Sequence, residues 1–402
     1  MKQSVNILKS FLTITIILVF SLFFTNTAKG QTNSNDSVEV SLLTCAPHNE
    51  VYSLYGHTAL RYHDLRTGED LAFNYGVFNF KKPFFILRFL FGLTDYELGV
   101  IPYDIFCEEY RKDGRSIIEQ VINLTADEKQ KLYEALKVNY RPENRTYRYN
   151  YFYDNCTTRA RDMIENCING TVKYATPKES NKITYRQMIH EKNAGHPWAA
   201  FGNDLCLGVK ADLGTSTRQQ QFLPENLMNA FNNAEIITEN NKRPLVKETI
   251  LAVNATPVQA DVEFPLTPSQ CSYILLLVSI IIIIIEIKRR KTLKIWNVLL
   301  LTCQGLAGII ILALFFSEHP TTSTNLQIFL FNPLPLFFLP SIIKGRTIYW
   351  RISAVLLIIF YIGNFFQDYA EGMNIVALCL LLRCIINLTL AQNIHKARTN
   401  KG

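Results

Sequence analysis

Apolar residues are concentrated at the two ends of the chain, whereas its middle has the mixed composition of a soluble domain. The segment 7–24 is almost wholly apolar, follows Lys2 and precedes the small residues Ala28 and Gly30. This order is typical of a secretory signal peptide, although an uncleaved N-terminal anchor has the same pattern. Either interpretation of residues 1–30 places residue 31 outside the cytoplasm.

Further apolar runs follow residue 270, and each is about as long as a bilayer requires. There are five of them, at 271–287, 295–317, 326–343, 352–366 and 375–390. Lys and Arg occur in the flanking segments 288–294, 344–351 and 391–402, but not in 318–325 and 367–374. The positive-inside rule then places the C-terminus in the cytoplasm and residues 31–270 outside it. We therefore expect residues 271–402 to form an all-α bundle of five transmembrane helices.

Arg383 lies near the middle of the last apolar run. A charge inside a membrane is costly and usually has a function, although a hydrogen bond that sets helix packing also explains it. We expect its partners to be the polar side chains of Gln304 and Asn364, in other apolar runs, and of Asn387, in the same run.

The middle of the chain changes from period-two to helical patterning. Strands are expected at 37–43, 58–62 and 71–78. Thr125 and Glu128 form a capping box that predicts a helix to about residue 139, and a second helix follows Asn155. We expect residues 31–234 to be an α+β domain. The segment 235–270 lacks strong periodicity and is interpreted as a linker to the membrane.

Two short segments carry the chemistry that a thiol enzyme needs. Residues 55–61 (Tyr-Gly-His-Thr-Ala-Leu-Arg) start a strand, and residues 151–162 lead into a helix whose first residues include Cys156. A thiol at a helix N-terminus has a lowered pKa because of the helix dipole. His57 in contact with it could act as general base, and the N–H groups of the first turn could bind an oxyanion.

The cysteine count leaves alternatives open. The segment 31–270 has five cysteines, and in an exported protein a disulfide partner or a buried core thiol is as reasonable for Cys156 as a nucleophile. A zinc site from His48, His57, His63 and a cysteine has no ligand pair at helical spacing to support it. The net charge of +7 is modest, and no basic, aromatic groove suggests nucleic-acid binding.

The two segments, together with 73–78 (Phe-Asn-Tyr-Gly-Val-Phe) and 222–227 (Phe-Leu-Pro-Glu-Asn-Leu), resemble the Lnb family of lipoprotein N-acyltransferases of Bacteroidota. The order of histidine strand before cysteine helix also resembles permuted papain-like (NlpC/P60-like) enzymes, including the lecithin:retinol acyltransferase group. The resemblance implies a permuted papain-like periplasmic domain on the bacterial inner membrane.

The family's reaction is the transfer of a fatty acyl chain from a membrane phospholipid to the α-amine of a diacylated lipoprotein. The resemblance implies Cys156 as nucleophile, passing through a thioester, and His57 as base, with no cofactor. Asn74, on the neighbouring strand, is the expected orienting residue. Arg159, Arg61 and Tyr153, which lie in or beside the same motifs, are expected to bind substrate.

The aromatic segment 81–91 begins with two lysines and is expected either to lie at the membrane interface beside the lipid entrance or to be a core helix. Two rival functions remain from the sequence. One is a Cys-His hydrolase of lipid or cell-wall peptide, and the other is a non-enzymatic envelope scaffold, which requires Cys156 in a disulfide or away from any cleft.

Overall fold

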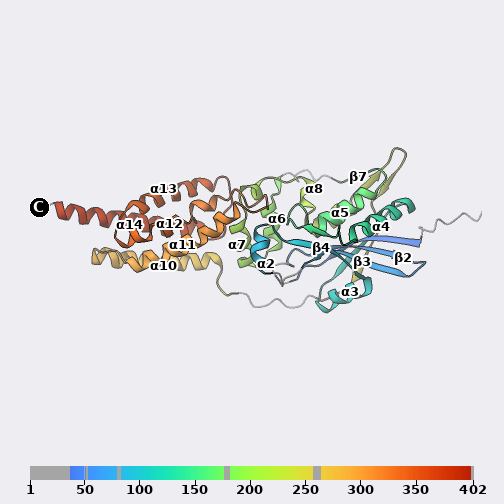
Figure 1. Ribbon diagram of the computed structural model, residues 1–402, viewed down its shortest axis with the longest axis horizontal. Coiled ribbons are helices and arrows are strands. Elements are labelled where there is room, and N and C mark those ends of the chain that lie inside the picture. Colours follow the sequence, from blue (N-terminus) through green and yellow to red (C-terminus); the bar gives the residue numbers. More distant parts are fainter. Residues whose placement is uncertain are drawn as a thin grey trace, which may run out of the picture.

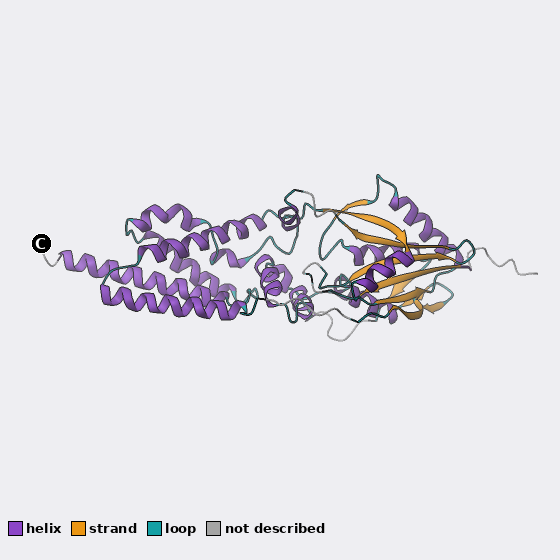
Figure 2. Cartoon of the chain, turned by 90° about the horizontal axis from the view of Figure 1, so that it is seen from below, coloured by secondary structure: helices purple, strands orange, loops and turns teal. Residues whose placement is uncertain are grey.

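The computed structural model describes residues 37–48, 50, 53–78, 83–175, 182–256 and 264–399. The expected signal or anchor segment 1–30 lies outside the described residues, as do Lys81 and Lys82. The described chain is elongated, with a sheet-rich domain at one end and a bundle of long helices at the other (Figure 1). Short helices lie between the two (Figure 2).

An antiparallel seven-stranded sheet forms the centre of the N-terminal domain. Its order is β10-β5-β1-β2-β3-β4-β6, in which β1 is Val38–Cys45, β2 His57–Asp64, β3 Glu69–Val77, β4 Asp95–Pro102, β5 Ile117–Ile122, β6 Thr146–Arg148 and β10 Val246–Val253. The strands expected at 37–43, 58–62 and 71–78 are therefore present as β1, β2 and β3, and they occupy the middle of the sheet.

Helices cover both faces of this sheet. The main core contains buried side chains of β1–β4 and of three helices, α4 (Ala126–Tyr140), α5 (Cys156–Cys167) and α9 (Pro224–Asn232). A smaller core on β1, β2 and β5 is covered by α3 (Tyr103–Lys112). The predicted capping box is present, since the Thr125 hydroxyl accepts from the Glu128 N–H and the Glu128 carboxylate accepts from the Thr125 N–H.

The interpretation of 235–270 as a linker is wrong for its first half. Residues 235–253 form β8 (Glu235–Ile237), β9 (Lys242–Pro244) and β10, and β8 pairs with both β7 (Thr171–Lys173) and β9 in a second, three-stranded sheet. β8 and β9 are too short to show alternation, and β10 is an edge strand that leaves five consecutive side chains exposed. Backbone pairing, which has no pattern in the sequence, holds these strands in place.

The C-terminal region is helical over most of its five apolar runs. It consists of α10 (Pro268–Arg289), α11 (Lys294–Leu314), η4 (Leu326–Phe329) with α12 (Leu334–Ile343), α13 (Ile348–Gly363) and α14 (Met373–Thr399). Among the described residues, four segments are long and apolar enough to cross a membrane, 268–289, 294–314, 326–343 and 373–392, and α13 is shorter. α13 begins at Ile348, four residues before the expected start of the fourth run.

Polar side chains attach the bundle to the N-terminal domain. Asn325 and Gln327 donate to the backbone carbonyls of Leu205 and Asp204, at 2.7 and 2.8 Å. These carbonyls belong to α7 (Pro197–Cys206), the helix that faces the bundle. Buried Arg186, on α6 (Tyr185–Lys192), donates in turn to the carboxylates of Asp204 and Asp212, each at 2.6 Å. The bonds fix the outer end of the bundle against the domain.

Arg383 is fully buried among three membrane helices. Its guanidinium donates to both oxygens of Glu286, at 2.5 and 2.9 Å, and to Asn297 Oδ1. Of the partners expected from the sequence, Asn387 donates to the Arg383 backbone carbonyl but does not contact its guanidinium. Gln304 and Asn364 bond to other residues. The arginine therefore joins α10, α11 and α14, which favours the packing interpretation.

Removing one partner of this pair should be more harmful than removing both. Arg383→Met leaves the Glu286 carboxylate buried without its cation, and should lower the free energy of unfolding by about 3–5 kcal/mol. The double variant Arg383→Met/Glu286→Leu should regain most of the loss, because no charge stays buried. Thermal unfolding of the purified protein in detergent measures both, and a double variant no more stable than Arg383→Met would contradict the account.

Candidate active site

Cys156 is the first residue of α5, and Asn155 fixes this helix start. The Asn155 side chain accepts from the N–H groups of Thr157 and Thr158, both at 2.9 Å. Its amide nitrogen donates to the carbonyls of Tyr151 and Phe222, again at 2.9 Å. A buried asparagine at this position therefore ties the thiol-bearing helix to the segment before it and to the 222–227 motif.

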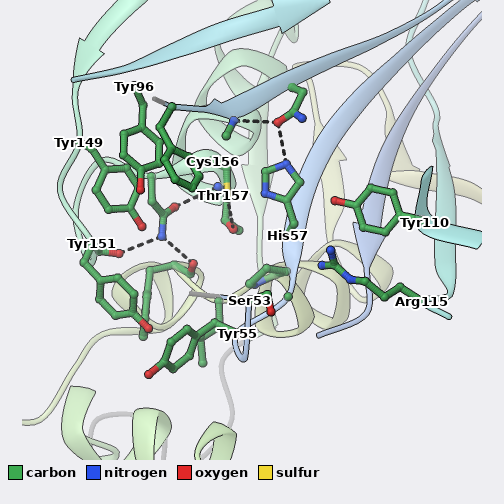
Figure 3. A pocket seen from close by; sticks show the side chains of 18 residues that line it. Ser53, Tyr55, His57, Tyr96, Tyr110, Arg115, Tyr149, Tyr151, Cys156 and Thr157 are labelled. Atoms are coloured by element: carbon green, nitrogen blue, oxygen red, sulfur yellow. Dashed lines mark hydrogen bonds between the residues drawn. The ribbon is translucent and has the colours of Figure 1, made fainter. Parts of the chain in front are cut away.

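His57 is the first residue of β2 and follows a glycine that the backbone requires. Gly56 has φ +75, and a Cβ there would lie 2.7 Å from the Cys45 carbonyl oxygen. A larger residue would therefore be strained and would collide with β1. The turn brings the imidazole of His57 beside the Cys156 thiol (Figure 3).

Asn74, on β3, determines which nitrogen of His57 carries the proton. Asn74 Oδ1 accepts from the Gly76 N–H at 2.7 Å, so the atom facing His57 is the oxygen and not the amide nitrogen. It lies 2.7 Å from His57 Nε2, which must then be the donor. Nδ1 is left as the ring nitrogen that can accept a proton, and His57 interacts with the neighbouring Cys156 side chain. The expected orienting role of Asn74 has a definite geometry here.

Charges and hydrogen bonds keep the partly buried thiol acidic. Burial raises the pKa of Cys156, but the charge and hydrogen bond of His57, the Thr58 N–H and the Thr157 hydroxyl lower it more, from 9.0 to about 7. Burial likewise lowers the pKa of His57, and the Cys156 thiolate with Asn74 raises it above its usual value. The two shifts are consistent with a thiolate–imidazolium pair near neutral pH.

The first turn of α5 offers fewer oxyanion donors than expected. The Thr157 and Thr158 N–H groups are occupied by the Asn155 cap, which leaves the Cys156 N–H as the donor of that turn. A backbone N–H on the nucleophile itself is well placed for an oxyanion formed at its own sulfur.

The thiol and the imidazole line a cavity of about 210 Å³. Arg115 contributes a basic group to the lining, and its guanidinium stacks on the Tyr110 ring, 4.4 Å from the ring centroid. Figure 3 shows this guanidinium directed toward the cavity from the side opposite Tyr149 and Tyr151. No motif in the sequence singled out Arg115, which lies just beyond α3.

A second cavity, of about 450 Å³, adjoins the first. Both are lined by the same five aromatic residues, Tyr55, Phe78, Tyr96, Tyr149 and Tyr151. The second cavity reaches from there to α2 (Phe85–Leu90) and to the outer end of the bundle. Part of the aromatic segment 81–91 is thus α2, which has no fully buried residue and lies where the domain meets the bundle. This placement favours the interface interpretation over a core helix.

The three residues expected to bind substrate line neither cavity. Arg61 lies four residues farther along β2 than His57, and its guanidinium bonds Asp70 and Glu119. Arg159 forms a bidentate pair with Asp154 and stacks on a tyrosine ring, and Tyr153 packs on Tyr185. Their contacts stabilise the fold around the site, and substrate binding has no support from their positions.

All nine cysteines are free, so Cys156 is not in a disulfide. The free thiol in a cavity removes the feature on which the scaffold alternative depended. Among the described residues, no cluster of three or more His, Cys, Asp or Glu side chains could hold a metal ion.

Alkylation of Cys156 should follow the pKa that His57 sets. The rate constant for iodoacetamide should rise with pH through a midpoint near 7, since the thiolate is the reacting form. Gly76→Ala should move this midpoint to 9 or above, because the new Cβ would lie 2.5 Å from His57 Cε1 and displace the ring from the thiol.

Gly202→Ala, on α7, is the matched control, because a Cβ there meets no atom within 4 Å. Peptide mapping assigns the label to Cys156. An unchanged midpoint in folded Gly76→Ala would show that His57 does not set the thiol pKa.

Two family descriptions match the chain. Residues 25–191 match the Lnb N-terminal periplasmic domain, and residues 259–394 match the Lnb transmembrane domain. No curated protein and no solved structure is similar enough to match. The two matched regions hold the thiol–imidazole pair and the helical bundle, in the order found in this sequence. The chain is a membrane protein with a periplasmic domain and belongs to the Lnb family.

Proposed function

We propose that this protein is a lipoprotein N-acyltransferase, which moves a fatty acyl chain from a phospholipid to the N-terminal amine of diacylglyceryl-cysteine lipoproteins. One observation carries the proposal. The cavity that contains an acidic thiol shares five lining residues with an apolar cavity at the end of the bundle nearest the domain. A thiol enzyme acting on a water-soluble peptide has no need of such a position.

The arrangement of the domain supports a permuted papain-like fold. The histidine strand β2 comes before the cysteine helix α5 in the chain, and α5 packs against β2 and β3 of an antiparallel sheet. In our proposal α13 also crosses the inner membrane, which gives five membrane helices and a cytoplasmic C-terminus. Hydrophobic mismatch for so short a helix is met by thinning of the bilayer or by flanking residues.

In the first half-reaction, the Cys156 thiolate attacks the ester carbonyl carbon of the phospholipid. The Cys156 N–H stabilises the oxyanion of the tetrahedral intermediate. Its collapse breaks the bond to the glycerol oxygen, and His57 Nδ1 donates its proton to that oxygen. Lysophospholipid leaves, and the acyl chain remains on Cys156 as a thioester.

In the second half-reaction, the neutral lipoprotein amine attacks the thioester carbonyl. Such an amine has a pKa of about 7.7–8.0, so a usable fraction is neutral near pH 7. His57, now uncharged, accepts the proton that the amine loses, and collapse expels the Cys156 thiolate. An ester is exchanged for an amide, which is downhill and requires no nucleotide.

The assay that tests this reaction contains full-length protein in detergent, phospholipid and a diacylated lipopeptide. Triacylated lipopeptide and lysophospholipid should appear in equal amounts, and Cys156→Ala should abolish both, because the Ser53 and Thr157 hydroxyls that also line the cavity are much poorer nucleophiles than a thiolate. Cys167→Ala, at the other end of α5, is the control and should stay active. Activity in Cys156→Ala would refute the mechanism, and free fatty acid as the sole product would favour the hydrolase alternative.

The same assay tests how the donor is held. We assign the phospholipid phosphate to Arg115, the arginine that lines the cavity, in place of Arg159. Arg115→Gln should raise KM for phospholipid with little change in KM for the lipopeptide. Arg159→Gln should change neither selectively, and the reverse pattern would contradict the assignment.

A further inference from the structure

The second cavity has the walls of a site for an apolar ligand. On one side it is lined by Phe85, Phe89 and Leu90 of α2, and on the other by Leu207 and Leu314. Leu314 is the last residue of α11, at the end of the bundle that faces the periplasmic domain. The cavity therefore lies between the domain and the membrane-spanning bundle, near the periplasmic surface of the membrane that the bundle crosses.

Several polar side chains that line this cavity are paired within the protein, although the buried Tyr151 hydroxyl has no hydrogen-bond partner among the described residues. Asn203 donates to the Tyr55 hydroxyl at 2.7 Å, and the Thr322 hydroxyl donates to the Leu314 carbonyl at 3.2 Å. His319 Nε2 donates to the Phe89 carbonyl at 2.9 Å, and burial lowers the pKa of His319, so this imidazole is uncharged at neutral pH. Such a lining favours hydrocarbon and has no charge to recognise a head group.

Exposed apolar side chains form part of the rim of this cavity. Ile86 lines the cavity and is nevertheless 73% exposed, so it lies at the rim. Phe84 and Phe316 are also large exposed apolar side chains. The carbonyls of Phe89, Leu90 and Phe91 bond to residues 317–319 of the loop after α11, which holds α2 at the surface of the bundle. An apolar chain can enter from the membrane without crossing water.

We propose that this cavity, named here the acyl slot, binds the fatty acyl chain that is transferred from the phospholipid, and that Phe89 and Leu90 help to set the chain length accepted. The inference rests on the proposed function and extends it to a binding site. A chain in the slot extends past the five shared aromatic residues, so that its ester carbonyl lies at Cys156. It would also keep water from the thioester.

Chain-length competition tests the slot in the active enzyme. Wild-type protein receives an equal mixture of dipalmitoyl and didecanoyl phospholipid with the lipopeptide, and mass spectrometry identifies the chain transferred. Leu90→Trp fills the slot and should shift the product ratio toward decanoyl by about tenfold. Phe89→Ala enlarges the slot and should shift it toward palmitoyl.

Leu87→Trp is the matched control, because Leu87 is on the same helix, is 52% exposed and lines neither cavity. Its product ratio should equal that of the wild type. Wild-type ratios in both Leu90→Trp and Phe89→Ala would overturn the proposal, and the second variant keeps the test decisive should the larger side chain prevent folding.

Photolabelling separates failure of the slot from failure of the proposed reaction. Cys156→Ala protein in nanodiscs is irradiated with a phospholipid that carries a diazirine near the end of one acyl chain. Labels should map to residues of the slot, such as Phe85, Leu90 and Leu314, and Leu90→Trp should reduce them. Labels that map only to the lipid-facing surface of the bundle would refute donor binding in the slot. So would labels in the slot that appear only when a diacylated lipopeptide carries the diazirine. Either result would refute it even if the wild-type protein transfers acyl chains.

Discussion

The site depends on holding a charged thiolate and a charged imidazole together in a partly buried position. Burial alone moves both pKa values toward the neutral forms, so the pair exists only if its partners outweigh that cost. Asn74 holds one nitrogen of His57, and the Thr58 N–H and Thr157 hydroxyl support the sulfur. Each partner is placed by the junction of β2, β3 and α5, so the sheet register and the helix start are constraints on the chemistry.

Glycine is required where this junction is tightest. Continued by two residues, the β2–β3 register that pairs Ala59 with Asn74 sets Gly76 opposite His57. A side chain at Gly76 would occupy the space of the imidazole. Gly56 likewise lets the chain turn into β2 against the Cys45 carbonyl. The Gly-His pair and the Asn-Tyr-Gly triplet of the sequence thus meet in the structure, where His57 contacts Asn74 and Gly76.

Local sequence patterns predicted much of this arrangement. The remaining contacts join residues far apart in the sequence and could not be predicted from local patterns. The capped start of α5 and the strands with His57 and Asn74 could be found because caps and alternation are local. Neither the partner of Arg383 nor the place of Arg115 could be found, since Glu286 stands beside the basic end of α10 and Arg115 has no motif. Arg61, expected from the sequence to bind substrate, lines neither cavity, because proximity along a strand does not imply proximity to the site.

The position of the domain explains how a thiol enzyme could use lipid at both steps. The hydrogen bonds from Asn325, Gln327 and Gln367 to carbonyls of 204–207 hold the domain on the outer end of the bundle. The cavity with Cys156 then adjoins the apolar cavity beside α2, where the donor's chain would lie. A membrane substrate is thereby brought to the thiolate while the rest of the domain stays in water.

The central claim is that Cys156 itself carries the acyl chain. Intact-protein and peptide mass spectrometry, after incubation with phospholipid and no acceptor, tests it directly. The account predicts one acyl group on the peptide that contains Cys156, removed by neutral hydroxylamine and discharged by the diacylated lipopeptide as triacylated product forms. Formation of triacylated product with no acyl group ever found on Cys156, in a rapid-quench series that covers the first turnover, would contradict it.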